Sequence, residues 1–152
     1  MLMLSFQLGN GHYAIPAQEV VEVLPRLELD PVARVPAWIA GLLDYRGTPV
    51  PVLDLCRLIA EQPCRNTFGS RIIMVDFVPA GAAGRLLGLL AEGVHETLRL
   101  DEEEFSEAGL PRQQAPYLGQ ATRDGERLIE RIRVNELIPP SIRKQLFPAE
   151  AG

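Results

Sequence analysis

The sequence predicts an all-β protein, either a barrel or a sandwich. Strand-like runs recur about every 8 to 12 residues, a spacing typical of these folds. Thirteen glycines and thirteen prolines punctuate the runs and leave room for only brief helices. At 152 residues the chain has the size of one domain with a core of its own.

Four pairs of strand-like runs predict β-hairpins, because a turn signal separates the two runs of each pair. Asn10-Gly11 supports the first turn, since these residue types tolerate the positive φ that a tight turn requires. Arg46-Gly47 lies in the second turn, small residues form the third, and Asp124-Gly125 lies in the fourth. The expected hairpins cover residues 2–15, 41–55, 71–91 and 118–134.

Shorter elements fit between the first hairpins. Pro16 favours a single helical turn at residues 16–19, because a proline early in a helix loses no hydrogen bond. Residues 20–24 return to strand chemistry. Residues 56–60 predict a short helix, and the polar residues 61–70 predict a mobile loop.

The later part of the chain adds an extended stretch and one clear helix. Residues 94–100 are extended, and the acidic run 101–104 predicts a solvated loop or a helix start. Ser141 follows two prolines, and Ile142 and Leu146 share one helical face. We therefore expect a short helix near the C-terminus.

Charge and hydropathy exclude two classes of partner. The formal net charge is −5, and the 15 Lys and Arg are scattered, whereas a nucleic-acid-binding surface gathers them into a stripe. No apolar window approaches the roughly 18 residues of a membrane-spanning helix, and no secretory leader is recognisable. The sequence predicts a cytoplasmic protein that neither binds nucleic acid nor inserts into a membrane.

The two cysteines carry no metal or redox motif. Seven residues separate Cys56 from Cys64, which matches neither a Cys-x-x-Cys pair nor a zinc knuckle. We therefore expect two unpaired thiols and a fold that needs neither a metal nor a disulfide.

The sequence also offers no catalytic constellation. His12 and His95 lack the spacing of a metal pair, and neither lies near a nucleophile elbow. Asp44, Asp54 and Asp76 each occupy a place where a strand puts one polar residue on its solvent face. A binding module is therefore favoured over an enzyme assembled from scattered carboxylates. Its ligand is a protein or, as the alternative, a small molecule held in a β-barrel.

A short internal echo divides the chain into two similar units. Residues 38–41 align with residues 117–119, and the turns at Arg46-Gly47 and Asp124-Gly125 then coincide. The echo suggests two β units of roughly 60 to 75 residues each. A groove between two such units is a natural recognition site.

Residues 35–55 carry a resemblance to a known family. They read VPAWIAGLLDYRGTPVPVLDL, which resembles the signature of CheW-like adaptor domains. Residues 6–23, the run RIIMVDF and residues 87–94 are similar to further motifs of the family in the same order. The signature residues that match in order and spacing are Gly41, Arg46, Gly47, Pro51, Val52, Asp54 and Leu55.

The resemblance implies a fold and a function. The fold is a pair of small SH3-like five-stranded β barrels packed together, within one CheW-like domain over residues 1–152. The two intertwined subdomains have motif-bearing segments at 16–80 and 81–138. The implied function is a noncatalytic scaffold, without cofactor or metal, between the cytoplasmic tip of a methyl-accepting chemoreceptor and the regulatory domain of a CheA-type histidine kinase. Such an adaptor is cytoplasmic and recruited to receptor arrays at the inner face of the membrane.

The resemblance also implies where the partners bind. In the family, the groove between the barrels and the Arg-Gly region contribute to receptor contact, while exposed apolar residues of one barrel meet the kinase. Arg46 and Gly47 carry over by direct match. The expected neighbours in the partner-binding site are Val35, Trp38, Ile39, Leu42, Tyr45 and Val50.

Two departures from the family pattern suggest a specialised partner. Asp44-Tyr45 stands where Asn-Leu is more usual, and the expected last strand, residues 128–133, is unusually charged. The runs YRGTPVPVLDLC and APYLG resemble the Wsp-type adaptors, which serve surface-sensing systems that control a diguanylate cyclase.

Two prolines set the place of the second hairpin in its sheet. Pro49 and Pro51 lie two residues apart, so their missing N–H donors fall on the same side of an extended strand. This strand is therefore expected at a sheet edge or a barrel seam.

Overall fold

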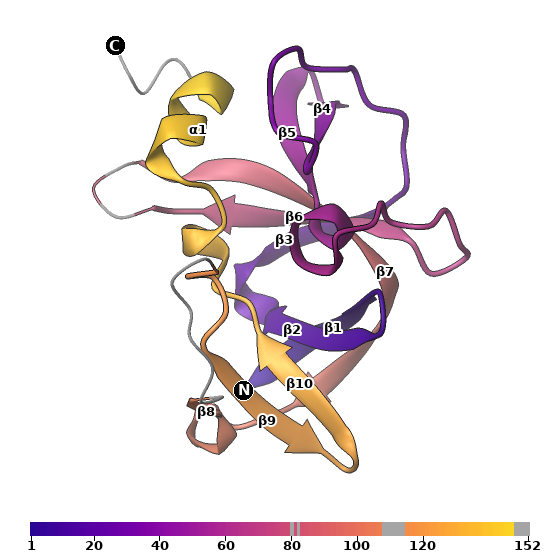
Figure 1. Ribbon diagram of the computed structural model, residues 1–152, viewed down its shortest axis with the longest axis vertical. Helices are drawn as coiled ribbons and strands as arrows, with labels where there is room; N and C mark the ends of the chain where they lie inside the picture. Colours follow the sequence, from indigo (N-terminus) through magenta and orange to yellow (C-terminus); the bar gives the residue numbers. More distant parts are fainter. Residues whose placement is uncertain (80, 82, 108–114, 148–152) are drawn as a thin grey trace.

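The computed structural model describes residues 1–79, 81, 83–107 and 115–147, and strands dominate them (Figure 1). The all-β expectation is confirmed, including the short helix near the C-terminus. The strands are β1 (Leu2–Leu8), β2 (Gly11–Pro16), β3 (Val20–Pro25), β4 (Ile39–Tyr45), β5 (Thr48–Asp54), β6 (Arg71–Phe77), β7 (Arg85–Arg99), β8 (Ser106–Glu107), β9 (Gln120–Asp124) and β10 (Arg127–Arg131). The helices are η1 (Ala17–Glu19), η2 (Cys56–Ala60), η3 (Glu102–Glu104), η4 (Val134–Glu136) and α1 (Pro140–Leu146).

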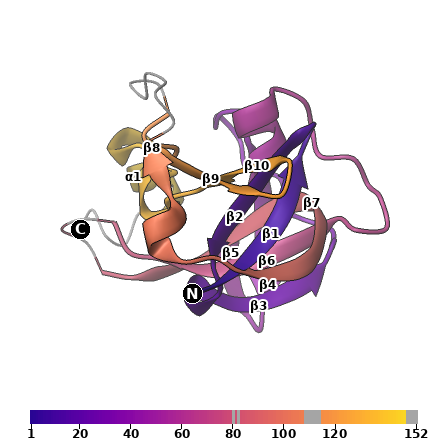
Figure 2. The ribbon, with the colours of Figure 1, turned by 90° about the horizontal axis from the view of Figure 1, so that it is seen from below.

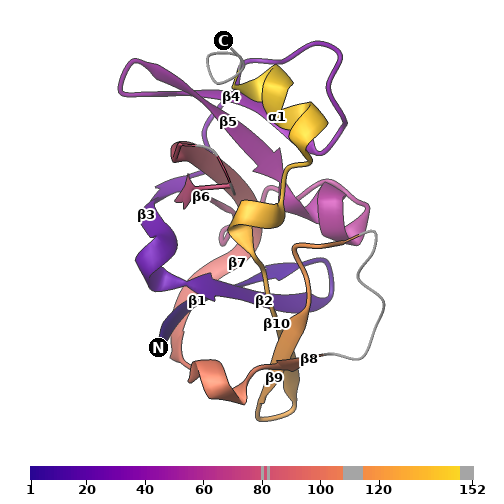
Figure 3. The same cartoon turned by 90° about the vertical axis from the view of Figure 1, so that its left-hand side faces the viewer.

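The strands form two sets that share β7. The first part of β7 pairs with β6 and, in parallel, with β5, while β3 extends β6 and β4 extends β5. The second part of β7 pairs with β1, and β2, β10, β9 and β8 follow in order (Figure 2). Figure 3 shows β7 passing from one half of the molecule to the other. The division into segments 16–80 and 81–138 remains a prediction.

Gly93 lies where β7 leaves one set and joins the other. The sequence predicts a strand at residues 85–91 and a separate extended stretch at 94–100, but the structure joins them into one strand of 15 residues. Gly93 has a φ of +58°, which an L side chain rarely adopts, and the pairing of β7 with β1 shifts register nearby. A bulge at a glycine thus redirects the strand between the two barrels.

All four expected hairpins are present. In the first, Gly9 takes the positive φ of +61°, so the turn lies one residue before the expected Asn10-Gly11. In the second, Arg46 and Gly47 both have positive φ, of +53° and +87°. β5 pairs with β7 only from Val52 onward, so both prolines precede that pairing, at the edge that the sequence predicts.

The core fills both barrels with apolar side chains. A large cluster includes Phe6, Leu53, Ile72, Phe77 and Leu89, all fully buried. A smaller cluster lies among β1, β2, β10 and the segment around η3, and it consists of Met3, Ala14, Leu100, Phe105 and Ile129. Within the described ranges, no helix has the length and apolar character needed to cross a membrane.

Candidate functional site

The turn between β4 and β5 presents Arg46 to solvent, where 77% of its side chain is exposed. The backbone N–H of Gly47 donates to Oδ1 of Asp44 over 2.9 Å and closes the turn. Nothing lies within 4 Å of the place that a Cβ on Gly47 would take, so the turn projects freely. The Asp44 that departs from the family pattern therefore braces the turn.

Contacts with β3 fix the orientation of the turn. The hydroxyl of Tyr45 donates to Oε2 of Glu22 over 2.5 Å, and Nη2 of Arg46 lies 3.5 Å from the same oxygen. The Arg46 guanidinium lies 5.0 Å from the centroid of the Tyr45 ring, within the range of a cation–π contact. The hydrogen bond to Glu22, aided by desolvation, raises the pKa of Tyr45 and keeps its hydroxyl a donor.

The expected site residues do not form one continuous patch. Ile39 and Val50 are buried in the core, with 6% and 2% of their surface exposed, so they support the surface from beneath. Val35, Trp38 and Tyr45 are half-buried and pack against the core, and Leu42 is half-buried on β4. Trp38 immediately precedes β4 and Arg46 follows it, so the strand separates the two.

Trp38 contributes to a groove of about 440 Å³ that the second half of the chain completes. Tyr117, which the internal echo aligns with the Trp38 segment, lies on the same groove. Its walls are mainly apolar, with polar side chains at Asn135, Glu136 and Arg143, and would suit a partner segment that is mainly apolar. Residues lining the groove include Trp38, Leu58, Tyr117, Leu137, Pro139 and Arg143.

Sequence reasoning missed the role of β3. Val21 and Val23 are exposed apolar residues on this strand, which among the described strands pairs only with β6, and Glu22 between them holds the turn. Exposure alternates along residues 20–25 in the structure, but the sequence VVEVLP carries no matching signal, because two valines occupy exposed positions and Glu22 is half-buried. The partner of Glu22 lies 23 residues further on, which no local pattern could reveal.

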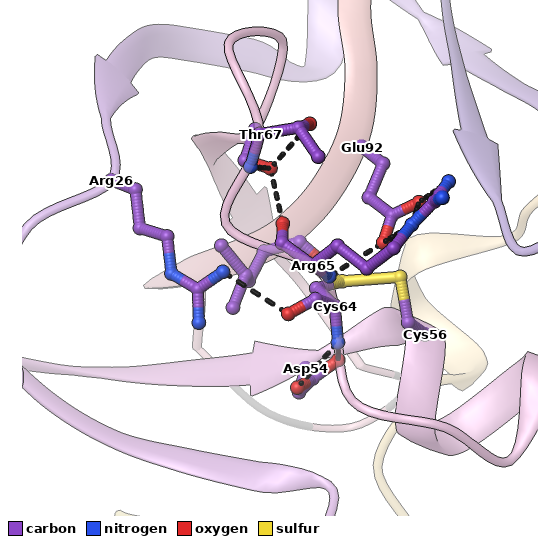
Figure 4. Close-up of polar contacts among 9 residues, drawn as sticks. Arg26, Asp54, Cys56, Cys64, Arg65, Thr67 and Glu92 are labelled. Atoms are coloured by element: carbon purple, nitrogen blue, oxygen red, sulfur yellow. Dashed lines mark hydrogen bonds and ion pairs between the residues drawn. A yellow bond between two sulfur atoms is a disulfide. The ribbon is translucent and has the colours of Figure 1, made fainter.

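The prediction of two unpaired thiols is wrong, because Cys56 and Cys64 form a disulfide (Figure 4). The η2 turn and the loop after it fold back and bring the two Cα atoms within 5.0 Å. Asp54 lies beside the pair, but its carboxylate accepts backbone N–H bonds from Arg57 and Cys64. Asp54 therefore anchors the local backbone.

A second cleft, of about 560 Å³, bears on the small-molecule alternative. Its walls combine the charged Arg26, Asp54 and Arg57 with the apolar Leu29 and Ile72. This mixture of a few polar groups with apolar walls is common in ligand sites.

The chain matches the family model of the CheW-like domain over residues 2–140. It is similar to the chemotaxis protein CheW of Klebsiella aerogenes, at 30% identity over 105 residues, which cover 69% of this chain and 60% of that protein. Protein FrzA of Myxococcus xanthus is 32% identical over 87 residues, or 55% of this chain and 54% of FrzA. The matches thus span little more than half the length of these relatives.

Protein PilI of Pseudomonas aeruginosa is 25% identical over 104 residues, which cover 68% of this chain and 56% of PilI. Among solved structures, the fold is similar to that of the scaffolding protein TtCheW from Thermoanaerobacter tengcongensis. The TM-score is 0.79 at 24% identity, and the match covers 91% of this chain and 87% of that one. This likeness confirms the expected pair of SH3-like β barrels.

Proposed function

Because this chain belongs to the CheW-like domain family, we propose that it is a noncatalytic scaffold between chemoreceptors and a CheA-type histidine kinase. It would join the cytoplasmic tip of a methyl-accepting receptor to the regulatory domain of the kinase. The observation that carries the proposal is the exposed Arg46 turn, which the family signature encodes and which Glu22, Asp44 and Tyr45 hold in place.

The proposed receptor surface includes the turn and the groove. Arg46 and Gly47 present the turn, Tyr45 lies beside Arg46, and Trp38 lines the groove. Val35 and Leu42 are half-buried and are proposed as further contact residues. The remaining two residues of the predicted site, Ile39 and Val50, keep this surface rigid from the core. The scaffold would need no cofactor and would work in the cytoplasm, at receptor arrays on the inner face of the membrane.

A surface-sensing pathway that ends in a diguanylate cyclase is the specific setting we propose. The runs YRGTPVPVLDLC and APYLG support it, because they resemble the Wsp-type adaptors. Deletion of the gene should then lower the cellular level of cyclic diguanylate on surfaces and leave swimming unchanged. Loss of swimming with an unchanged second-messenger level would instead indicate a motility pathway.

Co-sedimentation with a receptor cytoplasmic fragment and its kinase tests the scaffold function. We expect one complex that contains all three proteins. Arg46→Ala should weaken receptor binding by about 1 to 3 kcal/mol, the range of a buried interface anchor, with little effect on folding. Arg123→Ala, an exposed arginine on β9, is the matched control and should bind like the wild type.

Two outcomes would count against this proposal. Failure of the wild type to bind either partner would remove the scaffold function. A loss of thermal stability in Arg46→Ala that accounts for the loss of binding would make Arg46 a structural residue.

A small-molecule-binding barrel is the second candidate, and the cleft beside Arg26 and Arg57 favours it. Its volume of about 560 Å³ lies within the usual range for ligand pockets. Native mass spectrometry of the protein purified from its own host should then show a retained ligand. A single species at the mass of the bare chain would speak against this candidate.

A further inference from the structure

The disulfide ties a helix to the loop that the sequence predicts to be mobile. Cys56 is the first residue of η2, and Cys64 lies within the polar segment 61–70. Both are buried, with 2% and 5% of their surface exposed. The bond therefore fixes the loop to the barrel at a point shielded from solvent (Figure 4).

Hydrogen bonds continue the attachment beyond Cys64. The backbone N–H of Arg65 donates to Oε2 of Glu92 over 2.6 Å, and the Arg65 guanidinium pairs with the same carboxylate at 3.1 Å. Further along, the hydroxyl of Ser70 donates to the carbonyl of Arg65, and the N–H of Val94 donates to the carbonyl of Gly69. These contacts hold the segment in one conformation in the disulfide form.

The loop presents one conspicuous side chain. Phe68 is 96% exposed, although the residues around it are fixed by the contacts above. A fixed loop holds this ring in a defined position, and the loss of its attachments would release it. The state of the disulfide therefore bears directly on what the loop presents to solvent.

The surroundings suit the reduced pair as well as the disulfide. Sγ of Cys64 lies 3.4 Å from the carbonyl oxygen of Leu90, which would accept a hydrogen bond from a thiol at that position. In the disulfide form the carboxylate of Asp54 also accepts the N–H of Cys64. After reduction only such noncovalent contacts would hold the loop, so it would open more often but still bring Cys64 back to Cys56, and the bond could form again.

Cys56 borders a small cleft from which a reductant could approach the bond. Cys56 lines a cleft of about 280 Å³ whose walls include Gln62, Arg65 and Glu92. A cleft of this volume admits the thiol end of a small molecule, whereas a folded protein could not enter it. Attack at Sγ of Cys56 would make Cys64 the leaving group, next to the Leu90 carbonyl.

We propose that Cys56 and Cys64 form a reversible thiol–disulfide pair that exchanges with low-molecular-weight thiols of the glutathione class and thereby controls the order of residues 61–70. A small thiolate attacks Sγ of Cys56, the S–S bond breaks, and Cys64 leaves as a thiolate that takes up a proton. A second small thiol then cleaves the mixed disulfide and releases the Cys56 thiol together with the oxidised small disulfide. One protein disulfide is reduced and two small thiols are oxidised, and an excess of the small disulfide reverses the sequence.

The test uses the purified wild-type chain equilibrated in buffers with different ratios of reduced to oxidised glutathione. Alkylation of free thiols followed by intact mass spectrometry counts the reduced cysteines. We expect the number of alkylated cysteines to change from none to two within the range of redox potentials of the cytosolic glutathione pool. Oxidised glutathione should reverse this change. A disulfide that persists under the most reducing cytosolic conditions would overturn the proposal, as would two thiols that never pair.

Hydrogen exchange tests the consequence for the loop. On reduction, amide exchange at residues 65–70 should rise by about tenfold or more, while the core strand β6 keeps its protection. Equal exchange of the loop in both states would overturn the link between the disulfide and loop order. This comparison needs no substitution, so it does not depend on whether a variant folds.

Serine variants provide the matched controls. The double variant Cys56→Ser, Cys64→Ser should show the loop exchange of the reduced wild type and should not respond to the redox buffer. Cys64→Ser alone leaves Cys56 beside the cleft and should gain the mass of one glutathionyl group, which oxidised glutathione supplies. Absence of that adduct would contradict attack at Cys56. None of these measurements depends on receptor or kinase binding, so they stand apart from the test of the proposed function.

Discussion

Arg46 owes its position to its neighbours. Its φ of +53° lies in the left-handed region, which costs a residue other than glycine roughly 1 to 2 kcal/mol. Contacts with Glu22 and Tyr45, and the closure of the turn by Asp44, offset that cost. Backbone strain that neighbouring contacts maintain is common at binding sites, because it holds a side chain ready for its partner.

The carboxylate of Glu92 pairs with Arg65, and this pair should make the stability of the fold depend on pH. Burial alone would raise the pKa of its carboxyl, but the hydrogen bonds and charge of Arg65 outweigh burial and hold the pKa below its ordinary value of 4.5. A carboxyl with a depressed pKa in the folded state stabilises the protein above its unfolded pKa and loses this effect as the pH falls through the folded pKa. Glu92→Gln should therefore lower the free energy of unfolding by about 1 to 3 kcal/mol at pH 7.

The pH dependence separates this charge effect from simple loss of packing. Below the ordinary carboxyl pKa, the difference between wild type and Glu92→Gln should shrink, as measured by urea unfolding across the acidic range. Glu103→Gln, an exposed carboxyl in η3, serves as the control and should show no such trend. A difference for Glu92→Gln that stays constant with pH would contradict the assignment.

At the scale of elements, β7 holds the fold together because it belongs to both barrels. Gly88 on this strand pairs with Val52 of β5 and with Met74 of β6. A Cβ at Gly88 would lie 2.8 Å from Cγ2 of Val52 and 3.1 Å from Cγ2 of Ile72. The missing side chain lets these two residues pack over the strand, which gives a physical reason for the glycine in the family-like run 87–94.

Gly88→Ala should consequently destabilise the protein by overpacking. We expect the free energy of unfolding to fall by about 1 to 3 kcal/mol, measured by denaturant titration. Gly84→Ala is the matched control four residues earlier, because its Cβ would lie 3.3 Å from Cγ2 of Val78 and 3.9 Å from the carbonyl oxygen of Phe77, and the position is exposed. If both variants lost the same stability, glycine flexibility and not crowding would explain the effect.

The sequence predicts the elements whose signals are local and misses those set by distant partners. The hairpins are found because each turn signal lies between its own strands. The continuity of β7 depends on β1 and β6, which come from earlier parts of the chain, and the disulfide depends on how η2 folds back. The same holds for the site: Arg46 was identified from a local motif, and Glu22 was not.

At the scale of the whole molecule, the two barrels offer different outer surfaces. The barrel of β3 to β6 exposes apolar side chains on its edge strand, at Val21 and Val23. β10 of the other barrel carries Arg127, Glu130 and Arg131, and only Leu128 is an exposed large apolar residue there. The exposed valines on β3 therefore suit apolar contact with a kinase domain better than the charged surface of β10 does.

This asymmetry predicts that receptor and kinase binding can be separated. Strand alternation places Val21 and Val23 on the face of β3 opposite Glu22, which holds the Arg46 turn. The double variant Val21→Ser, Val23→Ser should thus weaken capture of the kinase regulatory domain by about tenfold or more and leave receptor capture within about twofold. Leu128→Ser removes an equally exposed apolar side chain from β10 and should leave both intact. Kinase capture that is lost in Leu128→Ser and retained in the valine variant would assign the kinase to the other barrel.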